Sequence, residues 1–296
     1  MEFKSGFVAI VGLPNVGKST LVNALLKKKV SIVTPKPQTT RNKVMAVYNE
    51  PNTQIVFVDT PGVHKSKSTL DKYMEKSIEI ATSDVDLILL MVDGSKVLYE
   101  QVNILLNKFK NCKAPMFLVV NKIDETSIDI VYPQIEKLQN PIFKEIVFIS
   151  ATKRKNLDKL IDLIKPYLND NIKYFSEDEY SDKNNIFLIS EIIREKALYL
   201  IQQEIPHGIA IKVEKIEKNG TILNIACTIF CEKQSHKAII IGKDGSMIKL
   251  IGQKARMELE KILNSKIYLE LWVKVKENWR DLPSTLQDIG YDPKDI

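Results

Sequence analysis

Residues 12–19 have the sequence GLPNVGKS, in which glycines, a lysine and a serine stand at a fixed spacing. The stretch fits G-x-x-x-x-G-K-[ST], follows the apolar run FVAIVG (7–12) and opens a helical pattern. Backbone N–H groups at a helix N-terminus bind phosphate oxygens. Lys18 would reach the β- and γ-phosphates, and the Ser19 hydroxyl would bind Mg²⁺. Because a chance match in a chain of this length has a probability of roughly 1%, we predict a nucleotide site.

Three further polar motifs each end a strand-like run. They are DTPG (59–62), NKID (121–124) and SAT (150–152). Ligands of an open α/β sheet bind at the carboxyl ends of its strands, so we expect these motifs to meet the glycine loop there. Asp59 would be the acidic partner of Mg²⁺ through a metal-bound water, and the Gly62 N–H would meet the γ-phosphate.

The NKID motif predicts that the base is guanine. The Asp124 carboxylate can accept hydrogen bonds from both the N1–H and the 2-amino group of guanine, which adenine does not offer. Ser150 and the Ala151 N–H would contact the base edge at O6. N-K-x-D alone is a weak motif and would fit a solvated loop end, but its place in the ordered series favours the guanine site.

A second glycine loop lies within IIGKDGSMI (240–248), between two helical patterns. It lacks the four-residue arc before Gly-Lys, and no hydroxyl follows the lysine, so it does not predict a second nucleotide site. It does fit the G-x-x-G loop with which KH modules clamp single-stranded nucleic acid, although a plain helix–helix turn is the alternative. The apolar residues would support the loop and line the groove floor. The predicted RNA-binding residues are Ile239, Ile240, Gly242, Lys243, Asp244, Gly245, Ile248 and Lys249.

The elements that must position these motifs alternate in the first half of the chain. Buried strands are predicted at 7–12, 44–49, 54–60, 86–93, 115–121 and 145–150, with helical patterns between most of them. Only NEPN separates the second strand from the third, so that pair is predicted to be an antiparallel hairpin on an otherwise parallel sheet. The fold class is therefore a doubly wound α/β domain.

The second half has a different order: a helix ending at Pro206, two strands hinged at Asn219-Gly220, two helices and a strand. This α-β-β-α-α-β order is that of a type II KH module. We predict four segments: a nucleotide-binding domain (1–170), a polar linker (171–185), a KH domain (186–276) and a C-terminal tail (277–296). Trp272 and Trp279 are predicted to be core and docking residues rather than stacking platforms for bases.

The composition of the chain indicates a globular protein without a membrane span or a disulfide framework. The 296 residues are 44% hydrophobic with a net charge of +6, and no apolar run approaches the ~18 residues of a membrane span. The three cysteines are too few for a disulfide framework. We expect Cys227 and Cys231 to be small buried residues of a protein in the reducing cytosol rather than metal ligands. Residues 233–276 hold ten basic residues against four acidic ones, which suggests a polyanionic partner, although a charge run alone also fits a solvated face.

Residues 6–168 resemble the translation-factor-like GTPases of the P-loop class. With the KH pattern, the whole chain resembles the Era family of bacterial GTPases. The resemblance implies GTP hydrolysis with Mg²⁺, binding near the 3′ end of small-subunit ribosomal RNA and a role in maturing the 30S subunit. It also implies a cytoplasmic protein that associates loosely with the inner face of the membrane. The stretches that carry it are GLPNVGKSTLVNALL, PQTTR, DTPGVHK, SEIIREK and LWVKVKENWRDLPSTLQDIGY.

The resemblance also assigns a threonine of KPQTTR (36–41) to Mg²⁺ and the γ-phosphate; Thr40, next to the arginine, matches the family position better than Thr39. The implied catalytic residues are Lys18, Thr40 and Gly62, and the implied Mg²⁺ residues are Ser19, Thr40 and Asp59. The predicted nucleotide contacts are Gly12, Leu13, Pro14, Asn15, Val16, Gly17, Lys18, Ser19, Thr20, Asp59, Thr60, Pro61, Gly62, Val63, Asn121, Lys122, Ile123, Asp124, Ser150 and Ala151.

Two positions bear on the rate of hydrolysis. Ras-type GTPases place a glutamine after D-x-x-G to orient the attacking water, whereas this chain has Val63, so we predict slow intrinsic hydrolysis. In related GTPases an asparagine at the position of Asn15 accompanies a potassium ion beside the phosphates, and we hypothesise the same ion here.

Two other classes of function remain as alternatives. A signalling switch could use the C-terminal module to bind protein, with the second glycine loop purely structural. An ATP-driven RNA remodeller is also conceivable, but Asp124 argues against it because adenine offers this carboxylate no donor pair. The substitution Lys243→Asp separates an RNA-binding module from a protein-binding one.

Overall fold

The computed structural model describes residues 2–137, 142–201, 208–292 and 294. Two compact units are formed. The first comprises Met1–Val33, Thr40–Lys65 and Met74–Asp182, and the second comprises Thr34–Thr39, Ser66–Tyr73 and Lys183–Ile296. Among the described residues, no helix combines the length and apolar character needed to cross a membrane.

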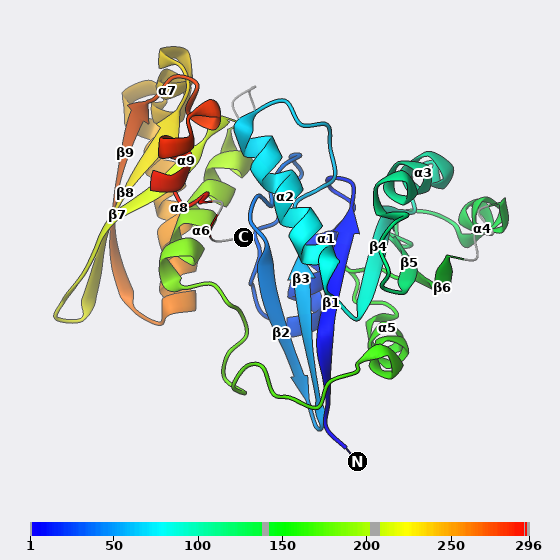
Figure 1. Cartoon of the computed structure of the whole chain (residues 1–296). Helices are drawn as coiled ribbons and strands as arrows, with labels where there is room; N and C mark the ends of the chain where they lie inside the picture. The colour runs from blue at the N-terminus through cyan, green and yellow to red at the C-terminus, as the bar shows by residue number, and fades with distance from the viewer. Residues whose placement is uncertain (1, 138–141, 202–207, 293, 295–296) are drawn as a thin grey trace. The chain divides into compact units, whose positions relative to one another are not determined.

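The first unit is built on a six-stranded sheet with the order β2-β3-β1-β4-β5-β6 (Figure 1). The pairs β1–β3, β1–β4, β4–β5 and β5–β6 are parallel, and the hairpin β2–β3 is antiparallel, as NEPN predicts. The strands span Lys4–Gly12 (β1), Val44–Glu50 (β2), Thr53–Asp59 (β3), Leu87–Asp93 (β4), Met116–Asn121 (β5) and Phe143–Phe148 (β6).

Helices cover both faces of this sheet, with α1 and α2 on opposite sides (Figure 1). The strands β3, β4 and β5 are buried at every position, which is why their sequences are apolar without alternation. The predicted doubly wound α/β class is confirmed. The helices span Lys18–Leu26 (α1), Thr69–Ser83 (α2), Leu98–Phe109 (α3), Ile128–Lys137 (α4) and Leu157–Ile164 (α5).

The chain that follows α5 returns along the sheet. Gln54 of β3 is fully buried; its Oε1 accepts from the Phe175 N–H at 3.0 Å and its Nε2 donates to the Phe175 carbonyl at 2.9 Å. Further on, the Asp182 carboxylate accepts from the Met45 N–H of edge strand β2 at 2.8 Å. Much of the stretch predicted as a linker, 171–185, is therefore hydrogen-bonded to the first unit.

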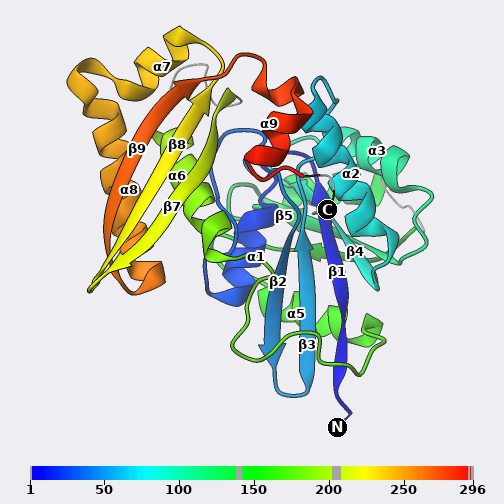
Figure 2. The same ribbon diagram turned by 60° about the vertical axis from the view of Figure 1, so that its left-hand side comes forward.

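The second unit contains a three-stranded sheet, β7-β8-β9, with β7–β8 antiparallel and β8–β9 parallel. Helices α6 and α8 pack on one face of it and enclose an isoleucine-rich core (Figure 2). The predicted order of elements is confirmed. They span Asn185–Leu200 (α6), Ala210–Asn219 (β7), Ile222–Cys231 (β8), Gln234–Ile241 (α7), Ser246–Leu263 (α8), Lys266–Val275 (β9) and Pro283–Asp288 (α9).

One prediction for this unit needs correction. Helix α6 ends at Leu200 rather than continuing to Pro206, because Ile201 adopts an extended conformation and turns into the core; Pro206 lies outside the described residues. The two tryptophans also differ. Trp279 is 0% exposed and donates from Nε1 to the Gly208 carbonyl at 3.1 Å, so it is a core residue as predicted. Trp272 is 47% exposed on β9, and its role as a docking residue stays a prediction.

Candidate functional site

The first glycine loop joins β1 to α1 and is fixed by a neighbouring strand. Gly17 precedes α1 with φ 102°, a conformation that favours glycine, and a Cβ added there would lie 2.3 Å from Asn121 Nδ2. The same Asn121 amide donates to the Val16 carbonyl at 2.8 Å. The end of β5 therefore holds the loop in a shape that leaves the first N–H groups of α1 for phosphate oxygens.

Lys18 occupies the inside of this loop. Its side chain is 6% exposed, and Nζ donates to the Gly12 and Leu13 carbonyls at 3.1 Å each. Burial lowers the pKa of Lys18 to about 8, and attraction to Asp59 only partly offsets this. A desolvated ammonium group whose hydrogen bonds go only to neutral carbonyls is suited to bind an anion such as a phosphate.

The DTPG motif lies directly against the loop. A Cβ added at Gly62 would lie 2.9 Å from the Pro14 Cα, so only glycine permits this approach. The Val63 N–H donates to the Gly12 carbonyl at 3.0 Å, and the Thr60 hydroxyl donates to a carbonyl of β1 at 2.7 Å. The structure thus brings together the two motifs that were predicted to share one phosphate site.

Three oxygen-bearing side chains meet beside Lys18. Ser19 Oγ lies 2.8 Å from Thr40 Oγ1 and donates to Asp59 Oδ2 at 2.7 Å. The other carboxylate oxygen, Asp59 Oδ1, is buried with no hydrogen-bond partner in the described part of the chain. Burial raises the pKa of Asp59, while Ser19 and Lys18 act to lower it.

These oxygens fit a magnesium ion. Mg²⁺ prefers oxygen ligands and keeps waters that a nearby carboxylate can hold. Thr40 points its hydroxyl at Ser19, whereas the Thr39 hydroxyl donates to the Lys36 carbonyl, so the geometry favours the threonine chosen from the sequence. Among the described residues, no cluster of three or more His, Cys, Asp or Glu side chains could hold a metal ion.

The NKID loop presents one unused carboxylate. Asp124 is exposed and makes no hydrogen bond or ion pair within the described residues. The Ala151 N–H, predicted to meet guanine O6, donates instead to Asn121 Oδ1 at 2.9 Å, and Ser150 Oγ accepts from the Lys153 N–H at 3.0 Å. In this structure the SAT motif therefore braces the NKID loop, and Asp124 is the group directed outward.

The sequence interpretation missed Asp93, which ends β4 and receives the Lys122 ammonium at 2.7 Å. A polar residue directly after a buried strand, at the same sheet edge as the other motifs, was the available signal.

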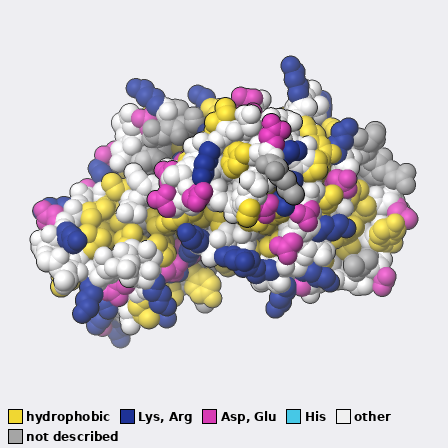
Figure 3. Space-filling view, turned by 90° about the horizontal axis from the view of Figure 1, so that it is seen from below, with side chains coloured by type: hydrophobic (Ala, Val, Ile, Leu, Met, Phe, Trp, Pro, Cys, Tyr) yellow, Lys and Arg dark blue, Asp and Glu magenta, His cyan; other side chains and the backbone are white. Residues whose placement is uncertain are grey.

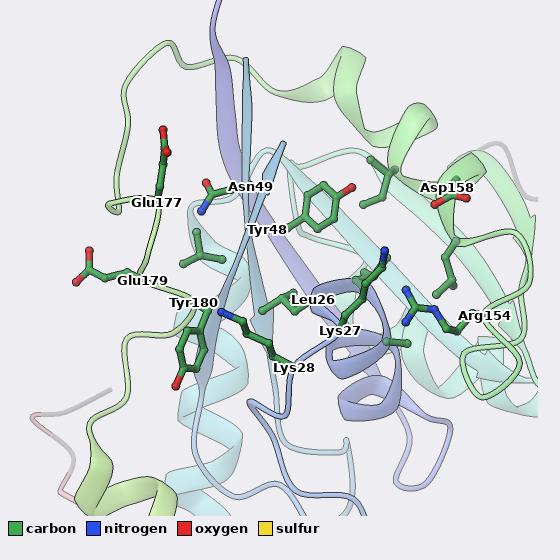
Figure 4. Close-up of a pocket in the computed structure, with 15 residues that line it drawn as sticks. Leu26, Lys27, Lys28, Tyr48, Asn49, Arg154, Asp158, Glu177, Glu179 and Tyr180 are labelled. Carbon is green, nitrogen blue, oxygen red and sulfur yellow. The ribbon is translucent and has the colours of Figure 1, made fainter. Parts of the chain in front are cut away.

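A cavity of about 330 Å³ lies at the other end of α1 (Figure 4). Lys27, Lys28, Tyr48, Arg154 and Tyr180 contribute to its lining, and Lys28 Nζ lies 4.5 Å from the centre of the Tyr180 ring. None of the lining residues belongs to the four nucleotide motifs, so this cavity is not the predicted nucleotide site.

The second glycine loop connects α7 to α8 in an open conformation. Gly242, Asp244 and Gly245 have φ values of 73°, 51° and 75°. Lys243 and Lys249 are exposed, and a Cβ added at Gly245 would meet nothing within 4 Å. This loop can therefore be approached by an extended chain from outside.

The apolar residues around this loop do not all face the same way. Ile239 and Ile248 are half-buried beside it, but Ile240 and Ile251 are 0% exposed in the core of the unit. The prediction that Ile240 contacts RNA therefore needs correction, because its side chain supports the loop from beneath.

On the molecular face seen in Figure 3, basic side chains are interspersed with acidic ones.

The fold and site define a P-loop GTPase joined to a KH module. Residues 7–122 match the family model "50S ribosome-binding GTPase", and residues 204–280 match "KH domain". The chain is 48% identical over 292 residues to GTPase Era of Clostridium tetani, covering 98% of this chain and 99% of the relative. It is 49% identical over 292 residues to GTPase Era of Clostridium botulinum, covering 98% of each.

Two solved structures of Era also match this chain. Era in complex with MgGDPNP and nucleotides 1506–1542 of 16S ribosomal RNA matches with a TM-score of 0.95 and 41% identity, over 98% of this chain and 99% of that one. Era of Aquifex aeolicus bound to GDP and AlF4⁻ matches with a TM-score of 0.92 and 41% identity, over 98% and 100%. The chain belongs to the Era family of GTPases.

Proposed function

We propose that this chain binds and hydrolyses GTP and, through its KH module, binds small-subunit ribosomal RNA near the 3′ end to assist maturation of the 30S subunit. The observation that carries the proposal is the likeness, over 98% of the chain, to Era in complex with MgGDPNP and 16S ribosomal RNA. The open GKDG loop with its exposed lysine is the part of this chain suited to the RNA backbone.

In the nucleotide site, each motif has a separate task. Lys18 and the N–H groups of α1 bind the β- and γ-phosphates, and the Gly62 N–H meets the γ-phosphate. Ser19 and Thr40 hold Mg²⁺, which neutralises developing charge on the phosphates, and Asp59 holds one of its waters. Asp124 accepts from the guanine base.

The guanine assignment is tested by Asp124→Asn. The amide keeps the size of the side chain but replaces one acceptor with a donor, so GDP affinity should fall by about 100-fold, the loss expected for a charge-assisted hydrogen-bonded pair. ADP affinity, which does not use this carboxylate, should not change. Equal GDP and ADP affinities in the unsubstituted protein would overturn the assignment.

Intrinsic hydrolysis is proposed to be slow, because no side chain at position 63 can orient the attacking water. Val63 is buried in the apolar core and offers only its backbone N–H, which already donates to Gly12. A potassium ion held beside Asn15 would supply part of the missing positive charge. Turnover measured in potassium and in sodium buffers tests this; equal rates would remove the ion from the mechanism.

The RNA assignment is tested by Lys243→Asp, with Lys218→Asp at the hairpin end of β7 as the matched control, since both lysines are exposed. Reversal of charge at the loop should weaken binding of a single-stranded RNA from the 3′ end of 16S ribosomal RNA by at least tenfold, while the control changes it less than threefold. If both variants bind alike, the glycine loop is structural, and a protein partner becomes the better assignment.

Loose association with the inner face of the membrane stays a prediction of the family resemblance. Cosedimentation of the purified protein with anionic lipid vesicles, in low and physiological salt, tests it; absence of the protein from the pellet in both would remove it.

A further inference from the structure

Asp93 lies at the carboxyl end of β4, one strand away from the NKID loop. It is paired in the sheet register with Asn121 at the end of β5. Its side chain is 1% exposed although it belongs to none of the four nucleotide motifs. A buried carboxylate at the ligand edge of a parallel sheet needs specific partners to stay ionised.

Its partners come from two loops. Asp93 Oδ2 receives the Lys122 ammonium at 2.7 Å, and Oδ1 receives the Ser95 hydroxyl at 2.6 Å and the Ser95 N–H at 3.1 Å. Burial alone would raise the pKa of Asp93, but the bonds from Lys122 and Ser95 outweigh it and hold that pKa below its usual value. Asp93 is therefore ionised, and its bond to Lys122 is charge-assisted.

A backbone bond reinforces this link. The Gly94 N–H donates to the Asn121 carbonyl at 2.8 Å, and a Cβ at Gly94 would lie 2.9 Å from that same oxygen. Residues 93 and 94 thus contact both members of the Asn121-Lys122 pair, one through a side chain and one through the backbone.

The NKID loop needs such support because its turn is unfavourable. Lys122 has φ 66°, in the left-handed region that residues other than glycine rarely adopt. This turn lies between Asn121, which braces the phosphate loop, and Asp124, which faces outward. If the turn relaxed, the direction of the Asp124 carboxylate would change.

We propose that Asp93 is a positioning residue for guanine recognition, which acts through Lys122 to hold the NKID turn and so directs Asp124 at the base. The inference rests on the proposed role of Asp124. The Asp93 side chain is 1% exposed and bonded to Lys122, so its effect on the nucleotide is exerted through that lysine rather than by contact. Its loss should therefore affect binding of the base more than binding of the phosphates.

The test compares GDP with IDP, which lacks the 2-amino group that Asp124 accepts from. Asp93→Ala should weaken GDP binding by about tenfold, and should reduce the GDP-to-IDP affinity ratio, because a misdirected carboxylate loses the contact that distinguishes the two. A general loss of folding would weaken both nucleotides equally. Asp93→Asn, which keeps the volume and one acceptor oxygen, should give an intermediate ratio.

Two further variants test whether Asp93 acts through Lys122. In a Lys122→Met background, Asp93→Ala should have less than a threefold additional effect on the ratio if it acts through Lys122. Asp86→Ala is the matched control, since this carboxylate precedes β4 at its other end and accepts from the Phe7 N–H at 2.8 Å. Asp86→Ala should change the thermal stability of the protein but not its GDP-to-IDP affinity ratio.

The outcomes are distinguishable. If Asp124→Ala changes the GDP-to-IDP ratio and Asp93→Ala does not, the positioning role is wrong while the proposed function stands. An unchanged ratio in Asp124→Ala would instead overturn the guanine assignment itself. Equal effects of Asp93→Ala in the presence and absence of Lys122 would overturn the route through the lysine.

Discussion

The two glycine loops of this chain have similar sequences and opposite surroundings. GLPNVGKS is enclosed: Lys18 is buried, Gly17 is in contact with Asn121, and Gly62 lies against Pro14. GKDG is open, with Lys243 exposed and free space around Gly245. Both use positive-φ glycines next to a helix N-terminus, and a Cβ added at Gly242 of the second loop would itself lie 2.7 Å from Met247, yet only the first loop has its lysine buried.

The difference follows from the ligand that each loop suits. A nucleotide phosphate chain is compact, so many fixed donors can converge on it and water can be excluded. A nucleic acid strand is extended and passes over the surface, so its loop must remain accessible and each contact contributes less. Because the first loop is enclosed and the second is open, we expect substitutions in the first loop to reduce ligand affinity or stability more than substitutions in the second.

The largest effect is expected from Lys18→Met, which removes a buried charge from the phosphate site. GDP binding should weaken by about 100-fold, because truncation of a desolvated charge pair typically costs about 2–5 kcal/mol. Calorimetric titration with GDP measures this. Lys28→Met, an exposed lysine just beyond the C-terminal end of the same helix, is the control. A loss below threefold for Lys18→Met would contradict the enclosed site.

Gly17→Ala should follow. The added methyl group meets both an unfavourable φ of 102° and Asn121 Nδ2 at 2.3 Å, so Asn121 must move away from the Val16 carbonyl. The free energy of unfolding should fall by about 2 kcal/mol, from left-handed strain and a lost hydrogen bond. Thermal or urea unfolding checks it; an unchanged midpoint would show that Asn121 does not fix the loop.

Alkaline pH should weaken GDP binding through Lys18. Its pKa in the free protein is lowered to about 8 by burial, and the phosphates bind the charged form, so binding above that pH requires uptake of a proton. Affinity should therefore fall by about tenfold between pH 7 and pH 9, with one proton taken up per GDP at the upper end. Calorimetry in buffers of different ionisation enthalpy measures the proton, and the Lys18→Met variant should lack this slope.

The smallest effect is expected from Gly245→Ala in the open loop. A Cβ there meets nothing within 4 Å, so only the φ of 75° opposes it, and the loss of stability should be about 1 kcal/mol. GTP turnover should be unchanged. A loss as large as that of Gly17→Ala would mean that the second loop is as constrained as the first, and the contrast between them would fail.

Sequence reasoning was strongest where the relevant residues are contiguous. The glycine loop, the DTPG turn and the buried strands are each encoded within a few residues, because backbone geometry and burial on both faces impose local requirements. It was weaker where a group has several possible partners. The Ala151 N–H could serve a base or a side chain, and its bond to Asn121 Oδ1 could not be foreseen from the sequence.

The sequence by itself therefore determined the class of fold, the family and the four motifs, since each is written in consecutive residues of restricted type. The tertiary structure alone decided that Trp279 is buried and Trp272 exposed, that Ile240 lies beneath its loop, and that Asp93 contacts Lys122. These outcomes depend on which distant segments are brought together when the strands pair. Asp93 and Lys122 are 29 positions apart in the chain, and they come within 2.7 Å only because β4 and β5 are neighbours in one sheet.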